Sequence, residues 1–188
     1  MAAVFQPVKA LITVDQFYRM GEAGVFPPDL RLELIDGELI EMPPIGPPHM
    51  QAVNRLTRLL VTAYGERAVV SVQNPVALRP RSLPQPDLAV LRREANERGH
   101  GVPEPPDTLL VVEVADSTLD WDRRVKMKLY ARAGVAQAWL VDVGGERVEV
   151  CADPSPDGYR SVRTLAAGRS LALPESGGRE IEVSRIFG

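Results

Sequence analysis

The stretch Thr108-Leu-Leu-Val-Val-Glu-Val114, with Asp116-Ser-Thr118 after it and Ala138-Trp-Leu-Val-Asp142 further on, decides how this chain folds. Its uninterrupted apolar run is typical of a strand buried on both faces of a sheet. Residues 116–118 are types that begin helices, and Gly134 suits the position just after a helix ends. The sequence therefore predicts a buried strand, a helix to about Ala133, and a second buried strand.

The N-terminal part predicts a helix, a hairpin and a longer helix. Thr13 begins a capping-box pattern, so a short helix should run to about Gly21. Residues 31–42 alternate apolar and polar around Asp36-Gly37, a pair that favours a type I′ β-hairpin turn. From Pro48 onward, apolar residues recur at helical spacing and predict an amphipathic helix.

Short apolar runs elsewhere predict further strands, and the whole chain is expected to form one α+β domain over residues 1–188. The additional strands are expected at 69–72, 75–78, 87–91, 147–151, 159–164 and within 181–186, with a polar loop over 92–107. The expected architecture is a mixed central β-sheet flanked by helices, with an N-terminal helix and hairpin and with C-terminal hairpins.

Composition excludes several classes of protein. The net charge of −3 argues against a protein that coats nucleic acid by neutralising phosphates. The single cysteine, Cys151, excludes a disulfide framework and a Cys/His zinc site. No apolar run of about 18 residues predicts a membrane span, and the N-terminal stretch lacks the order of a signal peptide. We expect a cytoplasmic protein with no membrane partner.

Two acidic residues occupy positions that suggest chemistry. Asp87 begins a strand directly after Pro86, and Glu113 lies near the end of the next, very apolar strand. A carboxylate buried there is costly unless it is paired or holds a cation. Adjacent strands lie about 4.8 Å apart, so the two acids can share one ion, and oxygen ligands suit Mg²⁺ or Mn²⁺. The alternatives are a Glu113–arginine ion pair and a turn cap by Asp87.

One helical stripe follows Glu113. Asp122, Lys126 and Tyr130 recur at spacings of four on the helix that begins just after the Glu113 strand. A lysine there can neutralise charge that develops on a phosphate group. The alternative is a surface Asp–Lys pair of small energetic value.

The acidic pair resembles the PD-(D/E)XK nuclease superfamily, in which an acid after proline precedes a second acid on a hydrophobic strand. More closely, the chain is similar to the bacterial Uma-type family of restriction endonuclease-like proteins. The similarity covers nearly all of the chain in order. It rests on residues 33–42, His49, residues 85–90, 113–118, 122–135 and 139–142.

The resemblance implies a restriction-endonuclease-like core and a set of site residues. Asp87 and Glu113 are implied as metal ligands, and Glu33 as an acid that completes the metal shell or holds one of its water molecules. The superfamily pattern puts the catalytic lysine at the position of Ala115, whereas the Uma-type family implies Lys126, in the following helix.

Two of the implied residues have simpler explanations. His49, in a first helical turn, is a candidate general base or substrate contact, but it can equally be a partly buried residue that caps this turn. Glu33 can lie on the solvent face of its hairpin strand, as we expect for Glu38 and Glu41.

The function predicted from these features is a metal-dependent DNA endonuclease, in which a water molecule activated by Mg²⁺ (or Mn²⁺) hydrolyses the phosphodiester bond. Local basic residues, in 120–132 and at Arg79, Arg81, Arg92 and Arg93, are expected to bind DNA phosphates. A homodimer is expected because double-strand cleavage needs two sites, with Trp139 and the C-terminal hairpins as its apolar surface. The alternatives are an inactive nucleic-acid- or protein-binding module on a nuclease scaffold, and a nuclease for RNA or branched DNA.

Overall fold

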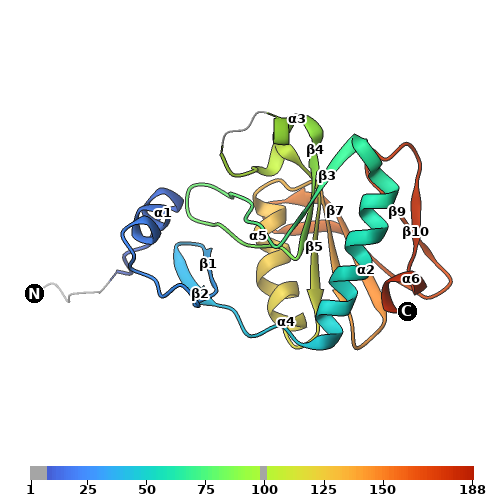
Figure 1. Cartoon of the computed structure of the whole chain (residues 1–188), viewed down its shortest axis with the longest axis horizontal. Helices are drawn as coiled ribbons and strands as arrows, with labels where there is room; N and C mark the ends of the chain where they lie inside the picture. Colours follow the sequence, from blue (N-terminus) through green and yellow to red (C-terminus); the bar gives the residue numbers. More distant parts are fainter. Residues whose placement is uncertain (1–7, 98–100) are drawn as a thin grey trace, which may run out of the picture.

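A six-stranded mixed sheet forms the centre of the computed structural model, which describes residues 8–97 and 101–188 (Figure 1). Strands β5 and β6 are parallel neighbours, and all other adjacent strands are antiparallel. The α+β class with a mixed central sheet is thus confirmed. The spatial order is β3 (Ala68–Val72), β4 (Leu88–Arg92), β5 (Thr108–Ala115), β6 (Gln137–Asp142), β7 (Arg147–Ser155) and β8 (Gly158–Ala166).

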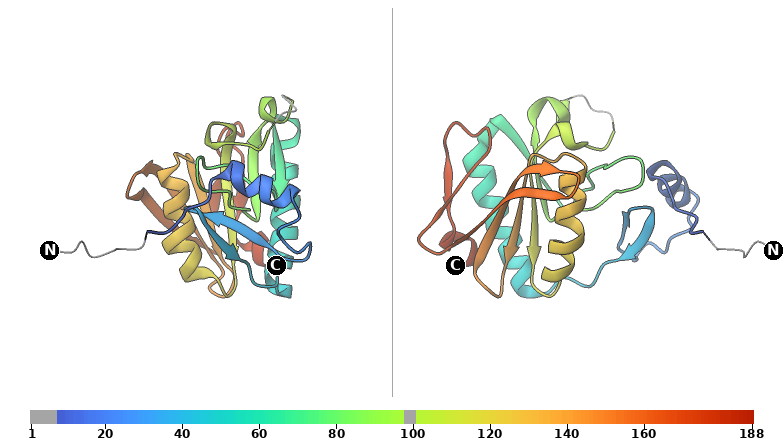
Figure 2. Two further views of the ribbon diagram at one scale, coloured as in Figure 1. Left: turned by 90° about the vertical axis from the view of Figure 1, so that its left-hand side faces the viewer. Right: turned by 180° about the vertical axis from the view of Figure 1, so that it is seen from behind.

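Helices cover both faces of this sheet. Helix α2 (Pro47–Tyr64) packs on one face, and the segment formed by α4 (Leu119–Trp121), η3 (Asp122–Lys126) and α5 (Met127–Arg132) packs on the other. The N-terminal α1 (Val14–Glu22) and the hairpin of β1 (Leu32–Ile35) and β2 (Glu38–Glu41) lie on one side of the molecule (Figures 1 and 2). The opposite side holds β9 (Ser170–Ala172), β10 (Glu180–Glu182) and α6 (Ser184–Phe187). Short turns complete the chain: η1 (Gly65–Arg67), α3 (Arg93–Glu97) and η2 (Pro105–Asp107).

The central strand β5 divides the core. All of its residues are buried, as the apolar run predicts. Its even-numbered residues, such as Leu110 and Val112, join the cluster beneath α2. Beyond Leu110, the odd-numbered residues Val111 and Ala115 join the cluster beneath α5, whereas Leu109, beside the register shift between β4 and β5, joins the one beneath α2. Side chains alternate along a strand, so Glu113 must point toward α5.

Two predictions that rest on local sequence patterns, the capping box of α1 and the turn between β1 and β2, are confirmed. At the start of α1, the backbone N–H of Gln16 donates to Thr13 Oγ1 and the N–H of Thr13 donates to Gln16 Oε1, at 3.2 and 2.8 Å. In the β1–β2 turn, Asp36 and Gly37 have φ of 50° and 85°, the left-handed values that a type I′ turn requires. A side chain at Gly37 would also meet Leu11, because a Cβ there would lie 2.7 Å from Leu11 Cβ.

One predicted strand is wrong, and a second is confirmed only for its first two residues. Residues 75–78 form a loop, because the N–H groups of Val76 and Ala77 donate to the carbonyls of Pro84 and Pro103 and not to a neighbouring strand. The strand expected within 181–186 ends at Glu182, and α6 follows from Ser184.

The helix predicted after Thr118 is interrupted by a π-helical turn. The N–H of Met127 donates to the carbonyl of Asp122, five residues earlier, so η3 is wider than an α-helix. Such turns are frequent at functional sites. Here the wide turn carries both Asp122 and Lys126, and both side chains are buried.

The prediction that Trp139 contributes apolar surface to a dimer is wrong. Trp139 lies in the core beneath α2 with no exposed surface, so it cannot contribute to an interface. The N-terminal stretch considered for a signal peptide begins in residues 1–7, which lie outside the described residues. In the described part of the chain, no helix is both long enough and apolar enough to cross a membrane.

Replacing Leu110 by alanine tests the central role of β5. Leu110 is completely buried, and truncation of such a leucine leaves a cavity that cannot fully collapse. We expect Leu110→Ala to lower the free energy of unfolding by about 2–5 kcal/mol in urea titrations. Val162→Ala is the control, because this β8 side chain is 54% exposed, and its effect should stay within about 0.5 kcal/mol. Equal effects of the two changes would contradict the layered core.

Candidate active site

Asp87 and Glu113 lie side by side where β4 begins and β5 ends. The register pairs Leu88 with Val112, so the next residues outward, Asp87 and Glu113, stand opposite each other on the α5 side. The backbone N–H of Val114 donates to Asp87 Oδ2 over 2.8 Å and fixes this carboxylate against β5. Two carboxylates from neighbouring strands therefore share one edge of the sheet.

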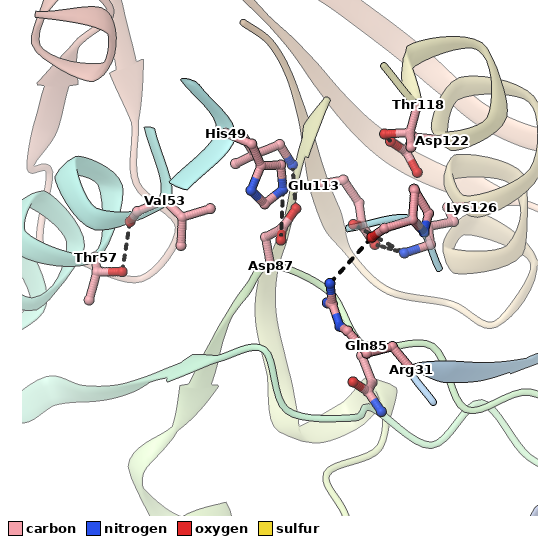
Figure 3. Close-up of polar contacts among 12 residues, drawn as sticks. Arg31, His49, Val53, Thr57, Gln85, Asp87, Glu113, Thr118, Asp122 and Lys126 are labelled. Carbon is pink, nitrogen blue, oxygen red and sulfur yellow. Dashed lines mark hydrogen bonds and ion pairs between the residues drawn. The ribbon is translucent and has the colours of Figure 1, made fainter. Parts of the chain in front are cut away.

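The Lys126 side chain reaches the same place from the π-helical turn (Figure 3). Its Nζ lies 2.9 Å from Glu33 Oε1 and 3.2 Å from Glu113 Oε1. The side chains of Lys126 and Glu33 are each only 2% exposed. Four separate parts of the chain therefore converge: β1, the start of β4, β5 and η3.

Hydrogen bonds hold these carboxylates in defined orientations. Tyr130 Oη donates to Glu113 Oε1 over 2.6 Å, and the backbone N–H of Gln85 donates to Glu33 Oε1 over 2.9 Å. Thr118 Oγ1 donates to Asp122 Oδ2 over 2.6 Å. The second oxygen of Glu33, Oε2, is buried and has no hydrogen-bond partner in the described part of the chain.

His49 contacts Asp87 instead of capping its own helix. It is the third residue of α2, and its Nε2 lies 3.1 Å from Asp87 Oδ1. Its Nδ1 is buried without a partner among the described residues. The side chain is thus held at the acidic pair, with one ring nitrogen available for a proton or a hydrogen bond.

These side chains line a cleft of about 70 Å³. A buried water molecule needs roughly 10–15 Å³ by the same measure, so the cleft has room for several waters or a hydrated ion. Carboxylates outnumber cations in its walls. The charged lining residues are Glu33, Asp87, Glu113, Asp116 and Asp122, with Arg31 and Lys126.

Burial and the close approach of charged groups shift the pKa values of Glu113 and Lys126. Burial raises the pKa of Glu113 well above its ordinary value, Lys126 opposes this shift, and Asp122, Asp87 and Glu33 add to it. Burial alone would lower the pKa of Lys126, but Glu113, Glu33 and Asp122 more than offset that effect and raise it. Lys126 is therefore an ammonium at neutral pH. Negative charge beside it favours any cation that enters.

The donor set suits a hard divalent cation, although it is not a complete cage. Among the described residues, no group of three or more His, Cys, Asp and Glu side chains is arranged to enclose a metal ion. The Lys126 ammonium lies between Glu33 and Glu113. Mg²⁺, however, typically binds proteins through one or two carboxylates and completes its shell with water and substrate phosphates. Asp87 and Glu113 fit that requirement, and the metal-ligand roles of Asp87, Glu113 and Glu33 all stay predictions.

The simpler structural explanations offered for Glu33 and for the Asp122–Lys126 pair are wrong. The sequence also predicts no role for Tyr130. Glu33 is not on a solvent face, although Glu38 and Glu41 are exposed. Asp122 and Lys126 are not a surface pair, since both are buried. Tyr130 was recognisable on the same helical stripe, but its bond to Glu113 was not predicted.

Most of the arginines expected to bind phosphates already have carboxylate partners. The pairs are Arg79 with Asp15 and Glu104, Arg92 with Glu175, Arg123 with Glu149, and Arg132 with Asp36. Lys126, counted in the same basic stretch, is buried in the site. The basic surface available to nucleic acid is smaller than the sequence suggests.

The fold and this cleft together define a restriction-endonuclease-like protein. The chain belongs to the Uma2 family, described as "Putative restriction endonuclease", whose model matches residues 14–184. Its fold is similar to the crystal structure of "a putative nuclease belonging to DUF820" from Anabaena variabilis ATCC 29413. That similarity has a TM-score of 0.72 at 15% sequence identity and covers 94% of this chain and 97% of the other. No curated protein matches the chain.

Removing the Lys126 charge tests the buried ion pairs. Lys126→Met leaves Glu33 and Glu113 buried without their counterion. The free energy of unfolding at pH 7 should therefore fall by about 3–5 kcal/mol in metal-free buffer. Adding Glu33→Gln to this variant should recover part of the loss, because one unpaired charge is then removed. Additive effects in this double-mutant cycle would contradict a direct Lys126–Glu33 interaction.

Cys151 should be an unreactive thiol. Burial, and the nearby Glu149, raise the pKa of Cys151 to about 12, while Arg123 opposes the shift. Because the thiolate is the reactive form, alkylation of the native protein by iodoacetamide should stay slow up to pH 9. The urea-unfolded chain should react with a midpoint near pH 8.5, the value of a free cysteine. Rapid labelling of the folded protein at pH 8 would contradict the buried position.

Proposed function

We propose that this protein is an endonuclease that hydrolyses phosphodiester bonds of DNA with bound Mg²⁺ or Mn²⁺. The observation that carries the proposal is the convergence of Glu33, Asp87, Glu113 and Lys126 in one cleft with excess negative charge. The family and the fold point to the same class of reaction.

Each side chain has a separable role in this proposal. Asp87 and Glu113 hold the ion, which supplies water activation and neutralises charge on the reacting phosphate. Tyr130 keeps Glu113 oriented through its hydrogen bond, and Glu33 holds Lys126 at the cleft. The Lys126 ammonium stabilises negative charge that develops on the phosphate oxygens.

His49 completes the proposed machinery. Its contact through Nε2 to Asp87 leaves Nδ1 without a partner among the described residues. The imidazole is therefore placed to accept a proton from the attacking water or to hold a substrate oxygen. A homodimer and a cytoplasmic location remain part of the proposal, the dimer supplying the two centres that double-strand cleavage requires.

One observation favours the alternative of a non-cleaving binding module on the same scaffold. Lys126 is already bonded to two carboxylates, so the pairs could form a closed network with a purely structural role. In that case, the cleft would bind no ion and the chain would bind its partner without chemistry.

Nicking of supercoiled plasmid distinguishes an active endonuclease from a non-cleaving binding module. We expect relaxation with Mg²⁺ or Mn²⁺ and none with EDTA. Asp87→Asn, Glu113→Gln and Lys126→Met should each lower the rate at least about 100-fold, because the first two weaken the proposed metal binding and the third removes the positive charge proposed to act on the reacting phosphate. The matched control is Glu41→Gln, which removes an exposed carboxylate on β2 and should retain the wild-type rate.

The contrary result is equally clear. If the wild type and Lys126→Met are equally inert on duplex, single-stranded and branched DNA with either metal, the non-cleaving module is the correct function. Mn²⁺ binding, followed by electron paramagnetic resonance, should be lost in Asp87→Asn if the ion binds as proposed.

A further inference from the structure

The mouth of the cleft has a composition that differs from its acidic floor. One part is Arg31; the other is the segment of Met42, Pro43, Pro44 and Ile45, which we call the apolar lip. The two are neighbours, because the Met42 N–H donates to the Arg31 carbonyl over 2.9 Å. Ile45 is 40% exposed, so its side chain is open to a ligand in the cleft.

The apolar lip is not built to bind phosphate. Pro43 and Pro44 have no backbone N–H, so this segment cannot surround an anion with amide groups as glycine-rich loops do. Its prolines fix the backbone and present a rigid apolar surface. Apolar side chains are among the surfaces against which enzymes hold a base that has left the stack. The chemistry of the lip therefore fits an unstacked base better than a sugar-phosphate chain.

Arg31 has the opposite character. Of the two cations that line the cleft, Lys126 is buried between carboxylates, whereas Arg31 is exposed. Within the described residues, its side chain forms no ion pair, and its one hydrogen bond, to the Pro43 carbonyl, is 3.5 Å long. That length is at the limit of a real hydrogen bond. The guanidinium is available for a phosphate, which it can bind through two N–H groups.

A duplex is a poor match for this surface. Double-stranded DNA carries one charge per about 1.7 Å of helix axis, twice that of one strand, and its binding depends on many free cations. Here Arg79, Arg92 and Arg123 are engaged with carboxylates, and the cleft itself carries excess acid. A single strand brings less charge to the acidic cleft and exposes its bases to the lip.

We infer that the proposed nuclease takes its substrate as an unpaired strand. Arg31 binds a phosphate next to the one that is cleaved, and Ile45 in the apolar lip contacts the neighbouring unstacked base. The substrate class is DNA that is single-stranded at the cleavage point, such as a free strand, a flap or a gap. This inference rests on the proposed function, and one centre is sufficient for such a substrate.

Binding and cleavage by the full chain test the inference separately. Anisotropy titrations would compare a fluorescein-labelled single strand with a hairpin duplex of the same sequence, with Ca²⁺ in place of Mg²⁺. We expect the single strand to bind at least about fivefold more tightly, because one of its bases can bury apolar surface against the lip. Cleavage with Mn²⁺ should show the same preference in kcat/KM.

Two variants assign the preference to named residues. Arg31→Gln should weaken single-strand binding about tenfold and reduce the salt-dependence slope by about 0.7, the contribution of one phosphate contact. Ile45→Ser should weaken single-strand binding about fivefold while leaving duplex binding unchanged, because the apolar contact with the base is lost. Arg31→Lys should restore the salt slope. Arg58→Gln and Val61→Ser, at exposed positions on α2, are the matched controls and should bind as the wild type does.

The possible outcomes separate this inference from the proposed function. If duplex DNA is cleaved as efficiently as single strands in a metal-dependent reaction, the inference is wrong and the nuclease proposal stands. If nothing is cleaved but the strand preference and its loss in Arg31→Gln appear, the recognition is supported and the hydrolysis is wrong. If both variants bind like their controls, Arg31 and the apolar lip do not recognise the strand.

Discussion

The buried ammonium of Lys126, held between Glu33 and Glu113, is the constraint on which the rest of the structure depends. Removing two carboxylates and an ammonium from water costs several kcal/mol per ion, and close pairing repays this only with good geometry. Here the geometry comes from elements far apart in the sequence, since Glu33 and Lys126 are 93 positions apart. The β1–β2 hairpin forms its own small sheet. Its backbone is bonded to the segment before β4, through the Leu34–Leu83 bridge and through the Gly37 N–H, which donates to the Arg81 carbonyl. The ion pair adds a buried side-chain link between this hairpin and the central sheet.

Much of the fold is predictable because local patterns determine it. The apolar run of β5, the Asp36-Gly37 turn and the Thr13 cap each require only neighbouring residues. Residues 75–78 show the limit of this reasoning. Their apolar character fits a strand, but their N–H groups bond to carbonyls of distant prolines, which no local pattern reveals. The π-helical turn is likewise invisible, because buried residues at spacings of four look the same in an α-helix with or without one wide turn.

The site was predictable to the extent that it lies on adjacent strands. The positions of Asp87 and Glu113 follow from two successive strands with an acid at matching ends. Glu33 is different, because alternation along a hairpin shows which residues share a face but not which face another element covers. Its place in the site came from the family resemblance alone. Tyr130 and Asp122 could be placed on the Lys126 stripe, whereas the backbone donors of Gln85 and Val114 depend on the tertiary arrangement.

The charge balance of the cleft supports the proposed dependence on a metal ion. Lys126 is neutralised by the carboxylates that hold it, so the remaining acids leave the cleft negative toward an approaching phosphate. A substrate anion is therefore repelled from the very groups proposed to act on it, and Arg31 at the mouth offsets only one charge. A divalent cation at Asp87 and Glu113 would reverse this balance and would also compete with Lys126 for Glu113. The ammonium, less firmly held, could then donate to the phosphate. In the proposed nuclease, the ion pair that stabilises the fold without metal would free Lys126 to act on the substrate only when positive charge enters the cleft.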